Sequence, residues 1–202
     1  MNLTDIENKF DIHLPNKIHT IYKSGAMEWL LYDYKWIRDN IEYIKKNPGS
    51  FLFNINADCE LIPFCYIEEE RAYLEELLSL DKEYGMKEKK LNPKYKIIPF
   101  ARMGSGDLCC FLFNAQSEDT RIVVYGIDTG EIEVWYENFD EFIFMQLVDS
   151  ILYFEVNINS IEIQKHLEFL TDKYRNILEN STVYELKLIS EKKEYKNIDI
   201  FI

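Results

Sequence analysis

The sequence predicts an α+β fold with a mostly antiparallel sheet, and three observations support this prediction. Amphipathic helical patterns open the chain, apolar and alternating runs joined by short turns fill its middle, and helical patterns return afterwards. Strands that follow one another through tight turns pair antiparallel. The chain has 202 residues, 47% of them hydrophobic, which is enough to bury a core without disulfides or a structural metal. We expect a domain over residues 1–150 and a C-terminal helix and strand extension over residues 151–202, packed on that domain.

Two short helices are predicted at the start of the chain. Apolar residues recur at helical spacing at Leu3, Ile6 and Phe10. Thr4 and Glu7 stand in the relation of a capping box, so we expect them to cap this first helix. A second helix is predicted over residues 16–23, before a Ser-Gly pair that stops it. The aromatic-rich stretch 25–46 is interpreted as a strand followed by a helix.

The middle of the chain carries most of the predicted strands. We place them at residues 51–55, 61–66, 96–101, 108–113, 121–127 and 131–137. The run 108–113 is almost wholly apolar, so this strand should be central in its sheet. A helix over residues 68–80 opens with three glutamates, which suit the positive end of the helix dipole. Tight turns are predicted at residues 103–107 and 128–130, and a further helix over residues 139–150.

After residue 150 the pattern changes. Asn159 and Glu162 form a capping-box pair ahead of one predicted helix. A single apolar stripe is expected along that helix, made of Ile163, Leu167, Leu170, Tyr174 and Ile177. Residues 183–189 and 198–202 are candidate strands.

The charge of the chain limits its partners. Asp and Glu number 36 against 23 Lys and Arg, which gives a formal net charge of −13. We therefore expect no direct nucleic-acid partner, because phosphate binding needs a basic face. The acidity is concentrated: residues 101–160 contain 11 acidic residues and only two basic ones, Arg102 and Arg121.

A candidate partner-binding face lies on the strand predicted at 131–137. Strand alternation puts Glu131, Glu133, Trp135 and Glu137 on one side, and apolar residues on the other. If the apolar side is core, a tryptophan stands among three carboxylates in water. Two interpretations stay open. Either this is a solvated acidic face on which Trp135 packs against a neighbouring loop, or the carboxylates steer a basic partner that the tryptophan anchors. Further acidic residues at adjacent turns would complete the partner-binding set: Asp107, Glu118 and Asp119.

No catalytic, metal or cofactor site is predicted. The triplet Asp128-Thr129-Gly130 occurs in aspartic proteases, but one copy is not a catalytic pair, and the residues suit a hairpin turn better. The histidines are solitary, and no nucleophile is combined with its base. The four cysteines form no metal-binding or disulfide pattern, which suits a reducing compartment. The sequence also shows neither a leader peptide nor a membrane-spanning run, so we expect a cytoplasmic protein without catalytic activity.

The order of these signals resembles the SUKH superfamily of SMI/KNR-like proteins. The resemblance covers about residues 3–145. It rests on a helix ended by Leu14-Pro15, a helix stopped by Gly25, the run Ile98-Pro99-Phe100-Ala101, Gly106-Asp107, the hairpin at residues 128–130, and Asn138 to Ile143. The resemblance implies an α+β fold in which helices pack on one side of a mixed, mostly antiparallel sheet. All of these motifs are structural and none is catalytic.

The resemblance also implies a function. Members are widespread in bacteria as immunity proteins beside polymorphic or contact-dependent toxins, many of which are basic nucleases. We therefore expect a bacterial immunity protein that occludes a cognate toxin domain through an acidic face. The alternative is a protein-interaction scaffold or regulator without a toxin partner, as in fungal relatives. The sequence leaves open whether the protein is a monomer or a homodimer.

Overall fold

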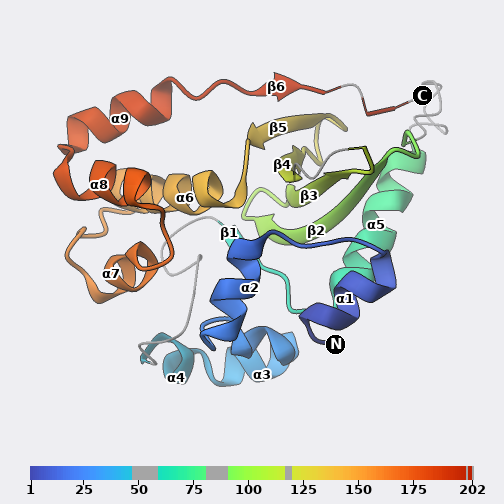
Figure 1. Ribbon diagram of the computed structural model, residues 1–202, viewed down its shortest axis with the longest axis horizontal. Helices are drawn as coiled ribbons and strands as arrows, with labels where there is room; N and C mark the ends of the chain where they lie inside the picture. Colours follow the sequence, from blue (N-terminus) through green and yellow to red (C-terminus); the bar gives the residue numbers. More distant parts are fainter. Residues whose placement is uncertain (47–58, 81–90, 117–119, 199, 202) are drawn as a thin grey trace.

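The computed structural model describes residues 1–46, 59–80, 91–116, 120–198, 200 and 201 (Figure 1). Its described residues form one six-stranded sheet whose spatial order follows the chain, and every pair of neighbouring strands is antiparallel. The strands are β1 (Cys59–Leu61), β2 (Tyr95–Met103), β3 (Leu108–Asn114), β4 (Thr120–Tyr125), β5 (Ile132–Tyr136) and β6 (Lys196–Asn197). This arrangement confirms the predicted α+β fold. The short connections between β2 and β5 favour it, because strands joined by few residues pair as antiparallel neighbours.

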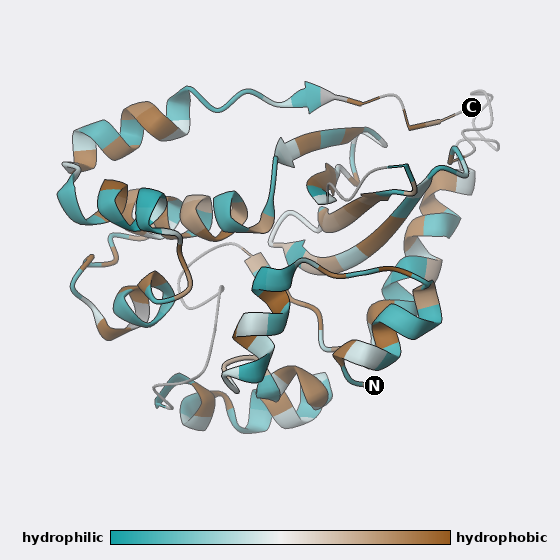
Figure 2. Cartoon of the chain, in the orientation of Figure 1, coloured by the Kyte–Doolittle hydropathy of each residue, from teal (hydrophilic) through white to brown (hydrophobic). Residues whose placement is uncertain are grey.

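Strand β3 is buried on both of its faces, as its apolar sequence predicts. Cys109 and Phe111 belong to the larger hydrophobic cluster, whereas Cys110 and Leu112 belong to a smaller cluster on the opposite face. The central strands are accordingly hydrophobic along much of their length (Figure 2).

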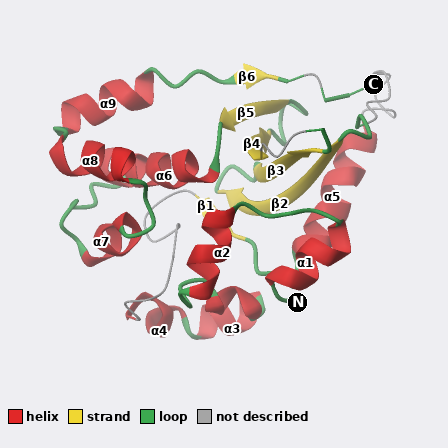
Figure 3. Ribbon diagram, viewed as in Figure 1, coloured by secondary structure: helices red, strands yellow, loops and turns green. Residues whose placement is uncertain are grey.

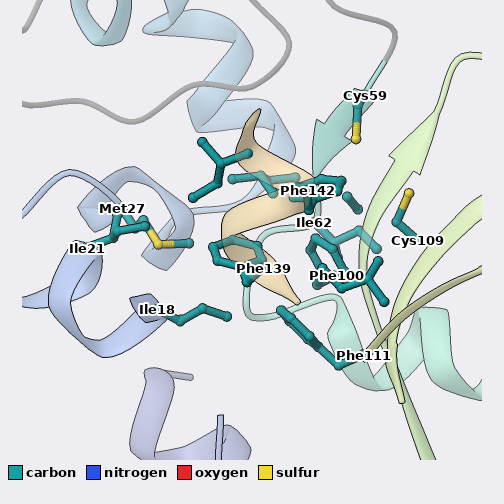
Figure 4. Close-up of a cluster of buried hydrophobic side chains, with 14 of the residues drawn as sticks. Ile18, Ile21, Met27, Cys59, Ile62, Phe100, Cys109, Phe111, Phe139 and Phe142 are labelled. Carbon is teal, nitrogen blue, oxygen red and sulfur yellow. The ribbon is translucent and has the colours of Figure 1, made fainter. Parts of the chain in front are cut away.

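Helices that precede the sheet in the chain and a helix that follows β5 cover the larger cluster. The N-terminal helices are α1 (Leu3–Phe10) and α2 (Asn16–Lys23), and the main later one is α6 (Phe139–Tyr153). Phenylalanines join sheet to helix: the ring centroid of Phe100 lies 4.1 Å from that of Phe111 and 5.1 Å from that of Phe142 (Figure 4). Asn138 caps α6 by accepting a hydrogen bond from the backbone of Glu141.

The smaller cluster is covered by α5 (Ile67–Leu80) and by the C-terminal residues. Leu74 of α5 and Ile200 are both fully buried there against the sheet. A bridge between Leu91 and Phe201 ties the end of the chain to the segment that precedes β2. Most helices therefore lie over one face, while α5 and the C-terminal residues close the other (Figure 3).

The strand predicted within residues 25–46 is wrong. A short 3-10 helix, η1 (Glu28–Leu31), is followed by α3 (Tyr34–Asp39) and α4 (Ile41–Lys46). The overlooked signal is Asp33, whose carboxylate accepts a hydrogen bond of 2.7 Å from the Trp36 backbone and so starts α3. The strand predicted at 51–55 lies outside the described residues. Of the strand predicted at 61–66, only the first residue belongs to β1, and a turn follows it.

The single helix predicted after residue 159 is also wrong. It is two helices, α7 (Ile161–Leu167) and α8 (Asp172–Asn180), separated by a turn. Ser160 rather than Asn159 caps α7, through a 3.3 Å hydrogen bond from the Ile163 backbone. The first helix of the chain is likewise capped by Asn2 and Asp5, not by Thr4 and Glu7.

The strand predicted at 183–189 forms α9 (Val183–Glu191) instead. Thr182 and Glu185 form a complete capping box at its start, and this local contact selects the helix. Within residues 198–202 the structure shows a bridge at Phe201, while positions 199 and 202 lie outside the described residues. Helices α8 and α9 pack on α6, which itself runs across residue 150. The division into a domain and an extension at that residue stays a prediction.

Candidate protein-interaction surfaces

The predicted alternation along β5 is interrupted by a bulge. Ile122 pairs with Tyr136 and Val123 pairs with Val134, so Trp135 is the extra residue. Val134 faces the smaller hydrophobic cluster, whereas Tyr136 faces the larger one. The three apolar residues that were expected on one side of the strand therefore lie on two different faces of the sheet.

Trp135 does not stand in water. It is half-buried and packs against the larger cluster, and its ring centroid lies 4.6 Å from that of Tyr195. Its indole Nε1 donates a 3.1 Å hydrogen bond to the carboxylate of Glu133. The covering residues belong to the C-terminal strap, which we define as residues 192–197. In Figure 1 the strap runs from α9 to β6, beside β5.

The strap also neutralises part of the predicted acidic face. Lys196 Nζ lies 2.8 Å from the carboxylate of Glu137, and Arg121 Nε lies 3.4 Å from it. These cations hold the pKa of Glu137 below its usual range.

Lys193 of the strap lies in a cage of aromatic rings. Its ammonium is 3.8 Å from the ring centroid of Tyr136, 4.7 Å from that of Trp135 and 5.2 Å from that of Tyr195. Burial lowers the pKa of Lys193 to about 8, and the nearby carboxylates of Asp149 and Glu141 only partly offset this. A groove of about 400 Å³ beside the cage is lined by strap residues, β5, α6 and α8.

Two further predicted site residues, Asp107 and Glu131, lie in connections between strands. Asp107 sits in the turn between β2 and β3, where its carboxylate accepts hydrogen bonds from the Ile127 backbone at 2.9 Å and from Ser105 at 2.8 Å. Glu131 is exposed in the neighbouring turn. Glu118 and Asp119 lie outside the described residues. Among the described members of the predicted set, Glu133 and Trp135 lie on β5, Glu137 follows it and Asp107 lies in another connection. The role of all seven residues in partner binding stays a prediction.

Aromatic side chains at the start of α3, together with Tyr66, form a feature that sequence analysis did not propose as an interaction surface. We call it the aromatic surface; it comprises Leu31, Tyr32, Tyr34, Trp36 and Tyr66. The rings of Tyr32 and Trp36 stack with centroids 3.9 Å apart, and those of Tyr34 and Tyr66 with centroids 4.6 Å apart. Leu31 and Tyr32 are exposed, at 37% and 42% of their possible area. Stacking holds the rings of each pair against one another.

Carboxylates border the aromatic surface. Glu60 of β1 and Glu70 of α5 both raise the pKa of Tyr34, although burial of the phenol is the larger cause. Arg102 forms an ion pair with Glu70 and lies over the ring of Tyr73. Its guanidinium also reaches the carbonyl of Gly106, which links the aromatic surface to the turn that contains Asp107.

The structure places the Asp128-Thr129-Gly130 triplet in a turn and the two adjacent cysteines in the hydrophobic core. Asp128 to Gly130 form a turn between β4 and β5, in which Gly130 has a φ of +65°. Cys109 and Cys110 are buried on opposite faces of β3. Among the described residues there is no group of three His, Cys, Asp or Glu side chains that could hold a metal ion. In the same part of the chain, no helix is long and apolar enough to cross a membrane.

The fold is thus that of an α+β domain whose notable exposed features are aromatic and acidic side chains. The chain belongs to the SMI1 / KNR4 family (SUKH-1), whose model matches residues 2–145. This match ends inside α6, so α7, α8, α9 and β6 lie beyond it. The searches of curated proteins and of solved structures found no match.

Proposed function

We propose that this protein is a non-enzymatic immunity protein that binds a basic bacterial toxin domain and blocks it by occlusion in the cytoplasm. Membership of the SUKH-1 family and a net charge of −13 support a protein partner of opposite charge. The observation that carries the proposal furthest is the aromatic surface with its carboxylate border, because it combines anchoring rings with charges that attract a basic protein.

The aromatic surface is the proposed docking site. Tyrosine and tryptophan are the residue types most enriched among interface positions that dominate binding energy. Here their rings are already stacked, so that binding orders few further side chains. Glu60, which borders the aromatic surface, would steer a basic partner towards it, and Asp107 and Glu131 would add to the negative charge of the domain. Long-range attraction of this kind raises association rates by ~10- to 1000-fold at low salt.

Affinity capture tests the proposal. The tagged chain is exposed to its native cell extract, washed at low and then at high salt, and the retained proteins are identified by mass spectrometry. We expect one basic toxin domain in roughly stoichiometric amount, released mainly by salt. Co-expression of that domain with this protein should restore growth that the domain alone prevents.

Three other results would contradict the proposal or a part of it. Several weak partners without a toxin would favour the scaffold alternative. A tight partner indifferent to salt would preserve the immunity function but exclude steering by carboxylates. Hydrolysis of a substrate by the purified chain, abolished in Asp128→Asn, would contradict the non-enzymatic role.

A further inference from the structure

The outer edge of β5 is filled by the chain's own strap. Strand β6 pairs with β5 through two register pairs, Glu133 with Asn197 and Val134 with Lys196. The family match ends at residue 145, so the family domain supplies this edge and the C-terminal part of the chain covers it. An uncovered strand edge exposes backbone donors and acceptors that pair readily with another extended segment.

The strap places two lysine ammonium groups at this edge. It places the Lys193 ammonium among the rings of Trp135, Tyr136 and Tyr195, and the Lys196 ammonium on the carboxylate of Glu137. Two of these rings, and the carboxylate, belong to β5 or to the residue that follows it. The edge therefore offers backbone pairing, an aromatic cage for one lysine and an ion-pair partner for a second.

The hold of the strap on this edge is limited. Its ladder is two residues long, and Tyr195 and Lys196 remain exposed. The groove of about 400 Å³ between the strap and α6 and α8 is open.

We propose that the β5 edge is a second binding site, which accepts an extended, lysine-bearing segment of the protein partner, and that the strap occupies this site until the segment displaces it. The proposal rests on the proposed function only in that the partner is basic. The incoming segment would pair with the backbone of Glu133 and Val134, place a lysine in the cage, and place a second cation on Glu137.

A peptide added in trans tests this inference without any toxin. The probe is a synthetic peptide with the sequence of residues 191–198, titrated into the full-length protein while the indole N–H resonance of Trp135 is followed by NMR. The variant Lys193→Ala weakens the strap but leaves Trp135 and Tyr136 in place. Lys187→Ala is the matched control, because Lys187 is an exposed lysine on α9 whose ion pair is with Glu191.

We expect Lys193→Ala to bind the peptide at least tenfold more tightly than the unchanged protein or the Lys187→Ala control does. A peptide in which the lysines are replaced by glutamine should lose this affinity. Equal affinity of all three proteins, or undiminished binding of the glutamine peptide, would overturn the inference. So would a Trp135 resonance that stays unmoved by saturating peptide in Lys193→Ala. Because no toxin is involved, these results are independent of the capture experiment.

Discussion

A single side chain, that of Lys193, alters which groups β5 exposes at its surface. Its ammonium covers Tyr136 and Trp135, two residues that the alternation of β5 does not place together. They meet around one lysine because of the bulge at Trp135. The Asp149 and Glu141 carboxylates of α6 favour the charge of this side chain, but burial outweighs them.

Substitution of Lys193 by methionine should remove a contribution by which the free energy of unfolding rises with pH. The pKa of Lys193 is about 8 in the folded protein, against 10.5 ordinarily. The unfolded chain therefore binds more protons between these values, and the free energy of unfolding rises with pH across that window. From pH 7 to 9.5 this contribution is roughly 1–2 kcal/mol. Urea denaturation of both proteins at several pH values measures it.

The comparison of the two proteins isolates Lys193. The phenols of Tyr136 and Tyr195 and the thiol of Cys110 have raised pKa values, which lower stability at high pH, but they are present in both proteins. Lys187→Met provides the control for loss of an exposed lysine. Identical pH slopes for the unchanged protein and Lys193→Met would contradict the buried position of this ammonium.

Gly106 is required by the geometry of the turn before β3. Its φ is +94°, and a β-carbon there would lie 3.4 Å from the Ile127 side chain. We expect Gly106→Ala to lower the free energy of unfolding by about 1–2 kcal/mol, because side chains disfavour positive φ. Gly104→Ala, at an exposed position of the same turn, should change it much less. Denaturant unfolding of both variants decides this, and equal effects would contradict the account.

Individual elements show where sequence patterns suffice. The strands β2 to β5 were predictable because few residues separate each from the next. The apolar residues on both faces of β3 also predicted its central place in the sheet. The structure of the stretch 183–189 was not predictable in this way, since its residues suit a strand as well as a helix. There the capping box of Thr182 and Glu185, a contact three residues apart, favours the helix.

Removal of the cap on α9 should test that explanation. In Thr182→Ala the hydroxyl no longer accepts the hydrogen bond from the Glu185 backbone. We expect the free energy of unfolding to fall by about 1 kcal/mol, the usual effect of losing such a cap. Val183→Ala is the control, because Val183 is exposed at the first position of the same helix. Thermal denaturation that finds no difference between these variants would mean that packing on α6, rather than the cap, fixes α9.

Contacts between segments far apart in the chain explain why the candidate site was harder to predict than the fold. A sequence window shows that residues 101–160 are acidic, but not which cations from elsewhere approach them. Lys17 pairs with Asp140, and Lys196 with Glu137, across large separations in the chain. The aromatic surface likewise depends on Tyr66 meeting Tyr34 across the fold. Long-range contacts of this kind follow from packing and leave no local signal.

The aromatic surface and its carboxylates are the proposed binding site for a basic protein. The most direct test of this proposal is the rate and affinity with which the captured partner binds the unchanged protein, Tyr32→Ser and Tyr184→Ser, at two salt concentrations. Tyr184 is the matched control, an exposed tyrosine on α9. We predict at least tenfold weaker binding for Tyr32→Ser alone, and slower association at high salt for all three. Equal affinities for Tyr32→Ser and Tyr184→Ser, with rates independent of salt, would contradict the account.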